Sequence, residues 1–300
     1  MRHLMHTSGD DGRGTVPNNK KGTVPAPAVA LITGASSGLG AEFSRQLAAM
    51  GWDLIITARR VEKLQEIADR LHRQYDAAVE VVQADLANAD DRSKIAEKIR
   101  TTANLNVLVN NAGFAIPEPF VEQDLANHQA MIDVHISAPT EFCHAAIPGM
   151  SLVPGGAVII NVASVAAFVS TGIYSAAKLY QINLSQGLTR ELQSGRSEAA
   201  PPTARRKGTV PNQGSRIRIQ ALCPGFVHTG FHSTQAFQGT DFKEKFPSWL
   251  WLTSDFVVKA SLRHAGLGKK RGMFRSGSIV CIPSLRYKLI AALGRLGLRQ

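Results

Sequence analysis

The chain has few cysteines and no apolar run long enough to cross a membrane. Its three cysteines, Cys143, Cys223 and Cys281, are far apart and lack the spacing of a metal site, so neither a disulfide framework nor a metal centre is expected. No apolar run approaches the roughly 18 residues of a membrane span, and the first residues lack the apolar core of a signal peptide. These absences predict a cytoplasmic protein with reduced cysteines and no metal.

Acidic residues are absent from residues 259–300, which carry ten Lys and Arg side chains. Residues 1–27 add a net +2 and residues 194–216 a net +4, so a total of +11 leaves −5 for the rest of the chain. The positive charge therefore belongs to the periphery, and no nucleic-acid-binding motif accompanies it. We expect no nucleic-acid partner.

Apolar strand patterns alternate with helical patterns along the remaining sequence. A hydrophobic content of 44% in 300 residues is enough for a substantial core. The alternation predicts an α/β fold, a single doubly wound Rossmann-like domain over 28–300, with a parallel sheet covered by helices on both faces. One helix is expected over 61–75, and seven strands near 28–33, 52–57, 79–84, 106–110, 157–163, 217–222 and 278–282.

A glycine-rich segment joins the first strand pattern to the following helical pattern. It reads Gly34-Ala-Ser-Ser-Gly38-Leu-Gly40 and follows the apolar run that ends at Thr33. Glycines at such a turn let the backbone approach a pyrophosphate, and the helix N-terminus supplies amide donors. The pattern predicts a dinucleotide site, and the alternative is an ordinary tight turn.

A tyrosine and a lysine four residues apart form the second motif, Tyr174-Ser-Ala-Ala-Lys178. Spacing four puts both side chains on one face of a helix. An adjacent ammonium would stabilise the phenolate and lower the pKa of the phenol, making it a general acid and base. The alternative is a solvated helix face.

These motifs, in this order, resemble the classical short-chain dehydrogenase/reductase family from about Ala28 to Ile290. Three further matches support the resemblance: Gln83-Ala-Asp85-Leu86, Asn110-Asn111-Ala112-Gly113 and Asn161-Val-Ala-Ser164. A fourth is Pro224-Gly225-Phe-Val227-His-Thr229.

The resemblance implies a hydride-transferring oxidoreductase with Ser164, Tyr174 and Lys178 as catalytic residues. Tyr174 would exchange the proton, Ser164 would donate a hydrogen bond to the substrate oxygen, and Lys178 would also hold the nicotinamide ribose. The family also implies a homo-oligomer, a dimer or a tetramer. The cofactor-binding residues implied are Thr33, Gly34, Ser36, Ser37, Gly38, Leu39, Gly40, Arg59, Arg60, Asp85, Leu86, Asn111, Ala112, Gly113, Tyr174, Lys178, Pro224, Gly225, Val227 and Thr229.

The end of the second strand indicates which cofactor is used. A carboxylate there would hold the ribose 2′-hydroxyl and repel a 2′-phosphate, but this chain has Ala58 followed by Arg59 and Arg60. We therefore expect NADP(H) rather than NAD(H). The alternative is that these arginines simply start the next helix on the surface.

The chain departs from the family pattern in two places. His135 stands where the family usually carries an asparagine that helps hold a water in a proton relay. A histidine could replace it there, or it could be a packed helix histidine in a neutral tautomer. The loop from Ser164 to Tyr174 is shorter than usual, which would reshape the pocket.

Three peripheral segments fall outside these motifs. Residues 1–27 form a polar arm, and residues 194–216 a Ser/Pro/Arg-rich insertion; both contain the repeat Gly-Thr-Val-Pro. Both are expected to be flexible, and the alternative for the insertion is a docking segment. A basic amphipathic helix is expected over 284–299, packed on the body or a second subunit, or adhering to an anionic membrane surface. Its stripe is Leu285, Leu289, Leu293 and Leu296, with Arg286, Lys288, Arg295 and Arg299 around it.

Aromatic residues make up only 6% of the chain, but seven of them lie between residues 226 and 252. The family's variable lid over the substrate pocket corresponds to this region, so an apolar carbonyl compound or secondary alcohol is the expected substrate. The aromatics could equally be ordinary core. The alternative function is a catalytically silent NADP(H)-binding protein with a sensing or structural role. The seven are Phe226, Phe231, Phe237, Phe242, Phe246, Trp249 and Trp251.

Overall fold

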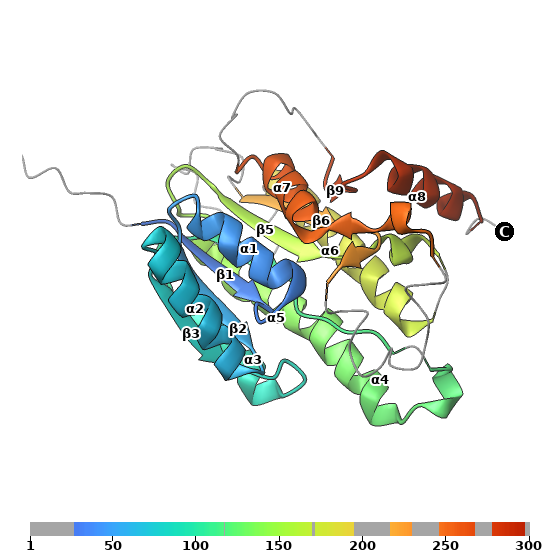
Figure 1. Ribbon diagram of the computed structural model, residues 1–300, viewed down its shortest axis with the longest axis horizontal. Coiled ribbons are helices and arrows are strands. Elements are labelled where there is room, and N and C mark those ends of the chain that lie inside the picture. The colour runs from blue at the N-terminus through green and yellow to red at the C-terminus, as the bar shows by residue number, and fades with distance from the viewer. Residues whose placement is uncertain are drawn as a thin grey trace, which may run out of the picture.

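A twisted parallel sheet lies between two layers of helices in the computed structural model (Figure 1). The structure describes residues 27–116, 118–169, 172–194, 217–229, 246–267 and 278–297. Residues 1–26 of the predicted arm 1–27, residues 195–216 of the predicted insertion 194–216 and residues 298–300 lie outside the described residues, so the predictions made for them stay predictions.

The sheet has seven strands in the order β3-β2-β1-β4-β5-β6-β9, all parallel. This confirms the doubly wound fold. The last strand is shorter than the predicted 278–282, because it lies at the sheet edge and pairs only with the end of β6. The strands are β1 (Val29–Thr33), β2 (Asp53–Ala58), β3 (Val79–Gln83), β4 (Leu105–Asn110), β5 (Ala157–Val162), β6 (Ile217–Leu222) and β9 (Val280–Cys281).

Helices cover both faces because side chains of the strands point alternately to the two sides. On β1, Ala30 and Ile32 join the core under α1, α2 and α7, while Leu31 joins the core under α3, α5 and α6. The helices are α1 (Gly38–Ala48), α2 (Val61–Tyr75), α3 (Ala89–Thr101), α4 (Leu125–Ile132), α5 (Ala138–Met150), α6 (Ile173–Ser194), α7 (Ser254–His264) and α8 (Leu285–Gly297).

Helix α2 has the bounds predicted from its sequence. Leu64, Ile67, Ala68 and Leu71 lie at helical spacing and are buried against the sheet. The helix ends where Asp76 adopts a left-handed conformation with φ 55°, and the backbone N–H of this residue donates to the carbonyl of His72.

Two features were not predicted from the sequence. A second, two-stranded parallel sheet pairs β7 (Val227–His228) with β8 (Leu252–Thr253). A π-helical turn, η2 (Asp133–Ser137), joins α4 to α5. Short 3₁₀ helices also occur: η1 (Phe120–Glu122), η3 (Val165–Phe168) and η7 (Ser248–Leu250).

The order in which successive strands join the sheet reverses between β1 and β4, which are neighbours although β2 and β3 come between them in sequence. In an open parallel sheet, a ligand binds at the carboxyl ends of the strands where the order reverses. Thr33 ends β1 and Asn110 ends β4. The motif residues predicted from the sequence follow these ends directly.

Candidate active site

The glycine-rich turn between β1 and α1 is packed too closely for side chains. Gly34 and Gly38 have φ values of +66° and +58°, which disfavour other residues. A Cβ atom on Gly40 would lie 2.4 Å from the carbonyl oxygen of Gly34 and 2.6 Å from Nδ2 of Asn111. Gly38 faces Thr229: a Cβ atom on Gly38 would lie 3.2 Å from the Cβ of Thr229. Leu39 packs against the core.

Thr33 and Asn111 join this turn to the end of β4. The Thr33 hydroxyl accepts from the backbone N–H groups of Asn111 and Ala112, both at 3.0 Å. In return, Asn111 Nδ2 donates to the carbonyl of Thr33 at 2.8 Å. These hydrogen bonds hold together the loop after β1 and the loop after β4. The backbones of the two loops therefore form one continuous surface.

Arg60 reaches the same turn from the start of α2. Its Nη2 donates to Ser36 Oγ at 2.9 Å and to Ser37 Oγ at 3.2 Å. Ser37 precedes α1 in an extended conformation, and its side chain does not cap the helix. Arg60 is also the residue before α2, at the start of the helix as the alternative interpretation expected, and its role toward a cofactor stays a prediction. Arg59 is exposed, and its carbonyl accepts from Gln83.

The remaining cofactor residues predicted from the sequence line the same edge of the sheet. Asp85 follows β3, and its carboxylate accepts from the backbone N–H of Ala87 at 3.1 Å. Leu86 is buried in the core at 6% exposure, so its side chain contributes packing there. Gly113 meets the ring of His135, since a Cβ on this glycine would lie 2.5 Å from Cε1. Pro224, Gly225 and Val227 follow β6.

Ser164, Tyr174 and Lys178 come together at the carboxyl end of β5. A side-chain hydrogen bond joins Ser164 to Tyr174. Lys178 lies one turn further along α6 with its Nζ 5.7 Å from the centre of the Tyr174 ring, and it donates to the carbonyl of Val162 at 2.7 Å. Only 4% of Lys178 is exposed, so the alternative of a solvated helix face is wrong.

The pKa values of this pair differ from the expectation of a lowered phenol pKa. Burial raises the pKa of Tyr174 to about 12, against a smaller opposing effect of the Ser164 hydrogen bond. Tyr174 is partly exposed. Burial also lowers the pKa of Lys178 to about 7. Each charged form costs free energy in this poorly hydrated interior, and this cost outweighs the attraction that the sequence suggested.

His135 lies in the π-helical turn η2 and is completely buried. Its Nε2 lies 3.0 Å from the backbone nitrogen of Phe114 and 2.9 Å from its carbonyl oxygen. Nδ1 is buried without a hydrogen-bond partner. Burial, and secondarily the charge of Lys178, hold its pKa well below the usual value, so the ring is neutral. The imidazole meets the Tyr174 ring edge-on, with centroids 5.7 Å apart.

Sequence reasoning missed a polar stripe on α6 that continues the catalytic face. Gln181 and Ser185 are 1% and 0% exposed, and follow Lys178 at helical spacing. Gln181 Nε2 donates to the carbonyl of His135 at 3.0 Å, and Ser185 Oγ accepts from Asn161 Nδ2 at 2.9 Å. Spacings of four, three and four from Tyr174 place all of these on one helix face, a signal that the sequence did contain.

The aromatic residues of the expected lid that the structure describes are partly core. Phe226 lies 4.5 Å from Phe246 and 5.3 Å from Trp251 between ring centroids, and Trp251 is buried. Trp249 is 59% exposed. The other three, Phe231, Phe237 and Phe242, lie outside the described residues.

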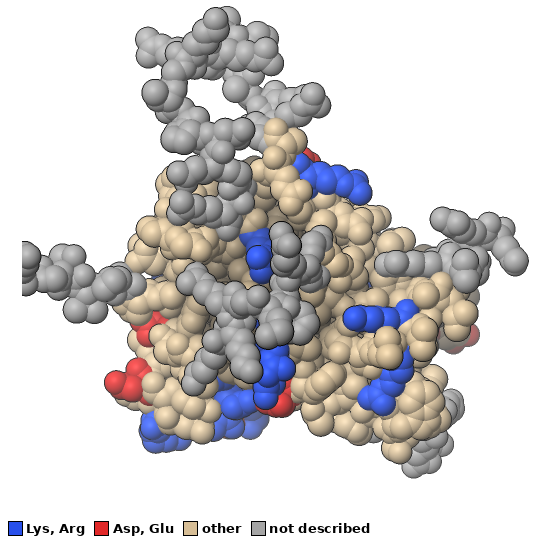
Figure 2. All heavy atoms as spheres, turned by 90° about the horizontal axis from the view of Figure 1, so that it is seen from above, with Lys and Arg blue, Asp and Glu red and all other residues tan. Residues whose placement is uncertain are grey.

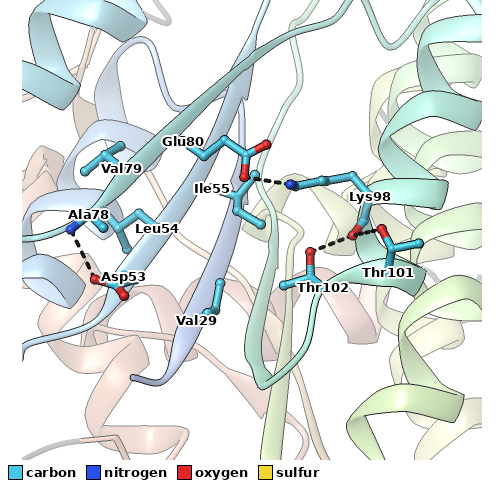
Figure 3. Close-up of a pocket in the computed structure, with 10 residues that line it drawn as sticks. All are labelled: Val29, Asp53, Leu54, Ile55, Ala78, Val79, Glu80, Lys98, Thr101 and Thr102. Atoms are coloured by element: carbon cyan, nitrogen blue, oxygen red, sulfur yellow. Dashed lines mark hydrogen bonds and ion pairs between the residues drawn. The ribbon is translucent and has the colours of Figure 1, made fainter. Parts of the chain in front are cut away.

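A separate hollow of about 420 Å³ lies at the opposite, amino ends of the strands (Figure 3). Its polar groups are already paired: Asp53 accepts from the backbone N–H of Ala78 at 3.1 Å, and Lys98 lies 2.6 Å from the carboxylate of Glu80. It contains none of the motif residues. We therefore regard it as a surface feature. Its lining is Val29, Asp53, Leu54, Ile55, Ala78, Val79, Glu80, Lys98, Thr101 and Thr102.

Comparison with known proteins relates this site to one enzyme family. The sequence pattern of the short chain dehydrogenase family matches residues 28–197. Sulfoacetaldehyde reductase 2 of Chromohalobacter salexigens is 32% identical over 210 residues, which are 68% of this chain and 74% of that protein.

Solved structures agree with this assignment. A short-chain dehydrogenase from Sphingobium yanoikuyae, in complex with NADPH, is 29% identical with a TM-score of 0.71, over 91% of this chain and 95% of that one. The bulky-bulky ketone specific alcohol dehydrogenase from Comamonas testosteroni is 26% identical with a TM-score of 0.66, over 91% and 93%. The chain belongs to the short-chain dehydrogenase family and is an oxidoreductase of that type.

Proposed function

We propose that the protein is an NADP(H)-dependent reductase of ketones or aldehydes, with Tyr174 as the proton donor. The observation that carries this proposal is the arrangement of Ser164, Tyr174 and Lys178. A phenol hydrogen-bonded to a serine hydroxyl stands beside a buried lysine, at the edge of the sheet where the glycine-rich turn lies.

The residues of the turn fit a dinucleotide. Gly34 and Gly40 leave a backbone surface without side chains, and the N-terminus of α1 presents N–H groups that Ser37 does not cap. Arg60, held between Ser36 and Ser37, would bind a 2′-phosphate together with the two hydroxyls. This arrangement supports NADP(H) over NAD(H).

Proton transfer during reduction can be assigned to residues of this site. The bound cofactor supplies the hydride. Tyr174 donates its proton to the substrate oxygen, and Ser164 stabilises the charge on that oxygen by a hydrogen bond. An alkoxide is a stronger base than a phenolate, so a phenol with a pKa of about 12 still protonates it.

His135 and Gln181 would position the segments that form the site. His135 holds the segment after β4 through the backbone of Phe114, and Gln181 ties the His135 carbonyl to the helix that carries Lys178. A neutral imidazole is suited to this positioning role.

The proposed substrate is an apolar ketone or aldehyde. The aromatic content of residues 226–252 supports this class, and so does the similarity to an enzyme described as specific for bulky ketones. The similarity to a sulfoacetaldehyde reductase makes a small anionic aldehyde the necessary comparison substrate.

The first test is NADPH oxidation by the purified protein with a panel of apolar ketones and aldehydes, compared with Tyr174→Phe. We expect the variant to lose turnover by about 10²–10⁴-fold, because the proton donor is gone, while NADPH binding changes little. Tyr180→Phe is the matched control, since the hydroxyl of Tyr180 only contacts Thr140 on the surface.

The cofactor is tested in the same assay with Arg60→Ala. The KM for NADPH should rise by about tenfold or more while the KM for NADH stays the same, because only NADPH carries the 2′-phosphate. Equal effects on both would contradict the role of Arg60. Tight NADPH binding without turnover of any compound would favour the alternative, a catalytically silent NADP(H)-binding protein.

A further inference from the structure

Helix α8 presents a row of exposed leucines. Leu285, Leu289 and Leu293 are 74%, 61% and 68% exposed, and they recur every four residues along one side of the helix. On the other side, Tyr287 and Ala291 are each 2% exposed. The helix therefore has one apolar face in the core and a second apolar strip outside it.

The inner face of α8 is firmly attached to the body. The Tyr287 hydroxyl accepts from the backbone N–H of Phe226 at 2.9 Å and donates to the carbonyl of Leu250 at 2.8 Å. Gly294 lies so close to η3 that a Cβ on it would be 2.2 Å from the carbonyl oxygen of Phe168. Since this face is fixed, the helix cannot turn to bury its leucines.

The exposed leucines stand in cationic surroundings. Arg286 and Lys288 lie beside them on the helix, and the Arg286 guanidinium lies 6.0 Å from the ring centre of Trp249, which is itself exposed. Among the described residues after 216, Asp255 is the only acid, and it already pairs with Arg45 at 3.1 Å. Figure 2 shows Lys and Arg side chains on the face that includes α8.

We propose that α8 binds to an anionic lipid surface, lying in the plane of the interface with its leucines among the acyl chains. A row of leucines flanked by cations on one helix, with an exposed tryptophan beside it, is typical of interfacial helices. Each Lys or Arg near such a surface is attracted to the anionic headgroups. No helix among the described residues has the length and hydropathy to cross a bilayer.

The charges favour lipid over the other occupants. In a symmetric contact with a second copy, Arg286 and Lys288 would meet the same cations, and the described part of this region offers no free carboxylate to pair with them. Nucleic acid would match the charge but would leave the leucines in water. An anionic bilayer matches both the charge and the apolar strip.

The location of α8 connects this surface to the active site. The helix packs on η3, which directly follows Ser164. Docking would therefore bring the active site close to the bilayer, where apolar carbonyl compounds concentrate. This last consequence depends on the proposed function, but lipid binding itself does not.

The test is sedimentation of the full chain with vesicles of phosphatidylcholine containing about 30% phosphatidylglycerol, beside vesicles of phosphatidylcholine alone. We expect binding to the anionic vesicles only, weakened by added salt. Leu289→Glu should weaken it by about tenfold or more, because an apolar anchor becomes a charge that the surface repels. Leu152→Glu is the control, because Leu152 is 83% exposed but lies at the other end of the molecule, between α5 and β5.

Three results would overturn the proposal. One is absence of sedimentation with anionic vesicles, and another is equal binding by wild type and Leu289→Glu. The third is a dimer, seen by analytical ultracentrifugation, that Leu289→Glu converts to a monomer, which would assign the strip to a second copy. Circular dichroism and NADPH binding show whether each variant is folded. Neither measurement depends on lipid binding.

Discussion

At the scale of residues, burial dominates the chemistry of Tyr174 and Lys178. The fold buries Lys178 and leaves Tyr174 only partly exposed, and this burial raises the pKa of Tyr174 to about 12 and lowers the pKa of Lys178 to about 7. In both cases the neutral form is favoured. A site made of a neutral phenol and a partly neutral amine is suited to giving a proton to a developing alkoxide.

The lowered pKa of Lys178 predicts how stability depends on pH. Between pH 7 and about 10, the unfolded chain keeps the proton on this lysine and the folded chain releases it, so the free energy of unfolding rises with pH. One proton corresponds to at most about 1.4 kcal/mol per pH unit.

Urea denaturation of wild type and Lys178→Met at several pH values measures this contribution. The wild type should gain stability relative to the variant as pH rises through this range. Comparing the two removes the titration of other groups, and the loss of the Lys178 bond to Val162 adds only a constant offset. Parallel pH profiles for the two proteins would show that Lys178 has an ordinary pKa.

At the scale of elements, the site depends on segments that approach one another with no room for a side chain. The turn after β1 lies against the end of β4, and the segment after β6 lies under α8. At the second of these contacts, Gly225 lies directly under the ring of Tyr287. A Cβ atom on Gly225 would coincide with this ring.

Gly40→Ala tests the contact between the turn after β1 and the end of β4. The added methyl group would meet the Gly34 carbonyl and the Asn111 amide, so we expect NADPH affinity to fall by about tenfold or more and stability to fall by about 1–3 kcal/mol. Gly187→Ala, in the middle of α6 with open space around it, should instead stabilise by about 0.5–1 kcal/mol. Calorimetric titration and thermal unfolding give both quantities, and an unchanged affinity in Gly40→Ala would exclude the turn from the cofactor site.

Tyr287→Phe tests the contact between α8 and the segment after β6. Loss of the hydroxyl leaves the N–H of Phe226 and the carbonyl of Leu250 without their partner, which should cost about 1–3 kcal/mol of stability. The KM for NADPH should rise more than kcat falls, because the loosened segment would line the cofactor site. The control is again Tyr180→Phe. A stability loss with unchanged kinetics would limit Tyr287 to a structural role.

At the scale of the whole molecule, the candidate active site and the predicted insertion lie at opposite ends of the strands. The motif residues gather at the carboxyl ends of the strands, whereas α6 ends and β6 begins at the amino ends. The insertion between them, residues 195–216, therefore joins the body far from the site. Because loop closure depends weakly on loop length, its removal should be tolerated.

Replacing residues 195–216 by a Gly/Ser linker of about six residues should leave kcat and both KM values within about twofold. Steady-state kinetics of the shortened and full chains measure this. A folded variant without turnover would contradict the interpretation as a passive insertion and would favour a functional one. Thermal unfolding distinguishes that result from a simple loss of the fold.

The amino-acid sequence by itself determined the elements of the fold and the identities of the motif residues. Strand and helix patterns predicted the seven strands and the bounds of α2, because hydrophobic periodicity reports which face is buried. The Gly34–Gly40 turn and the pair Tyr174 and Lys178 were recognisable because their spacing is local.

Only the tertiary structure decided what depends on contacts between distant segments. The pKa of Tyr174 is raised rather than lowered, His135 bonds the backbone of Phe114, and Tyr287 closes over Gly225. The two short strands β7 and β8 exist only because they pair with each other across residues 229–251. Desolvation and long-range hydrogen bonds arise from three-dimensional packing, and no local pattern in the chain records them.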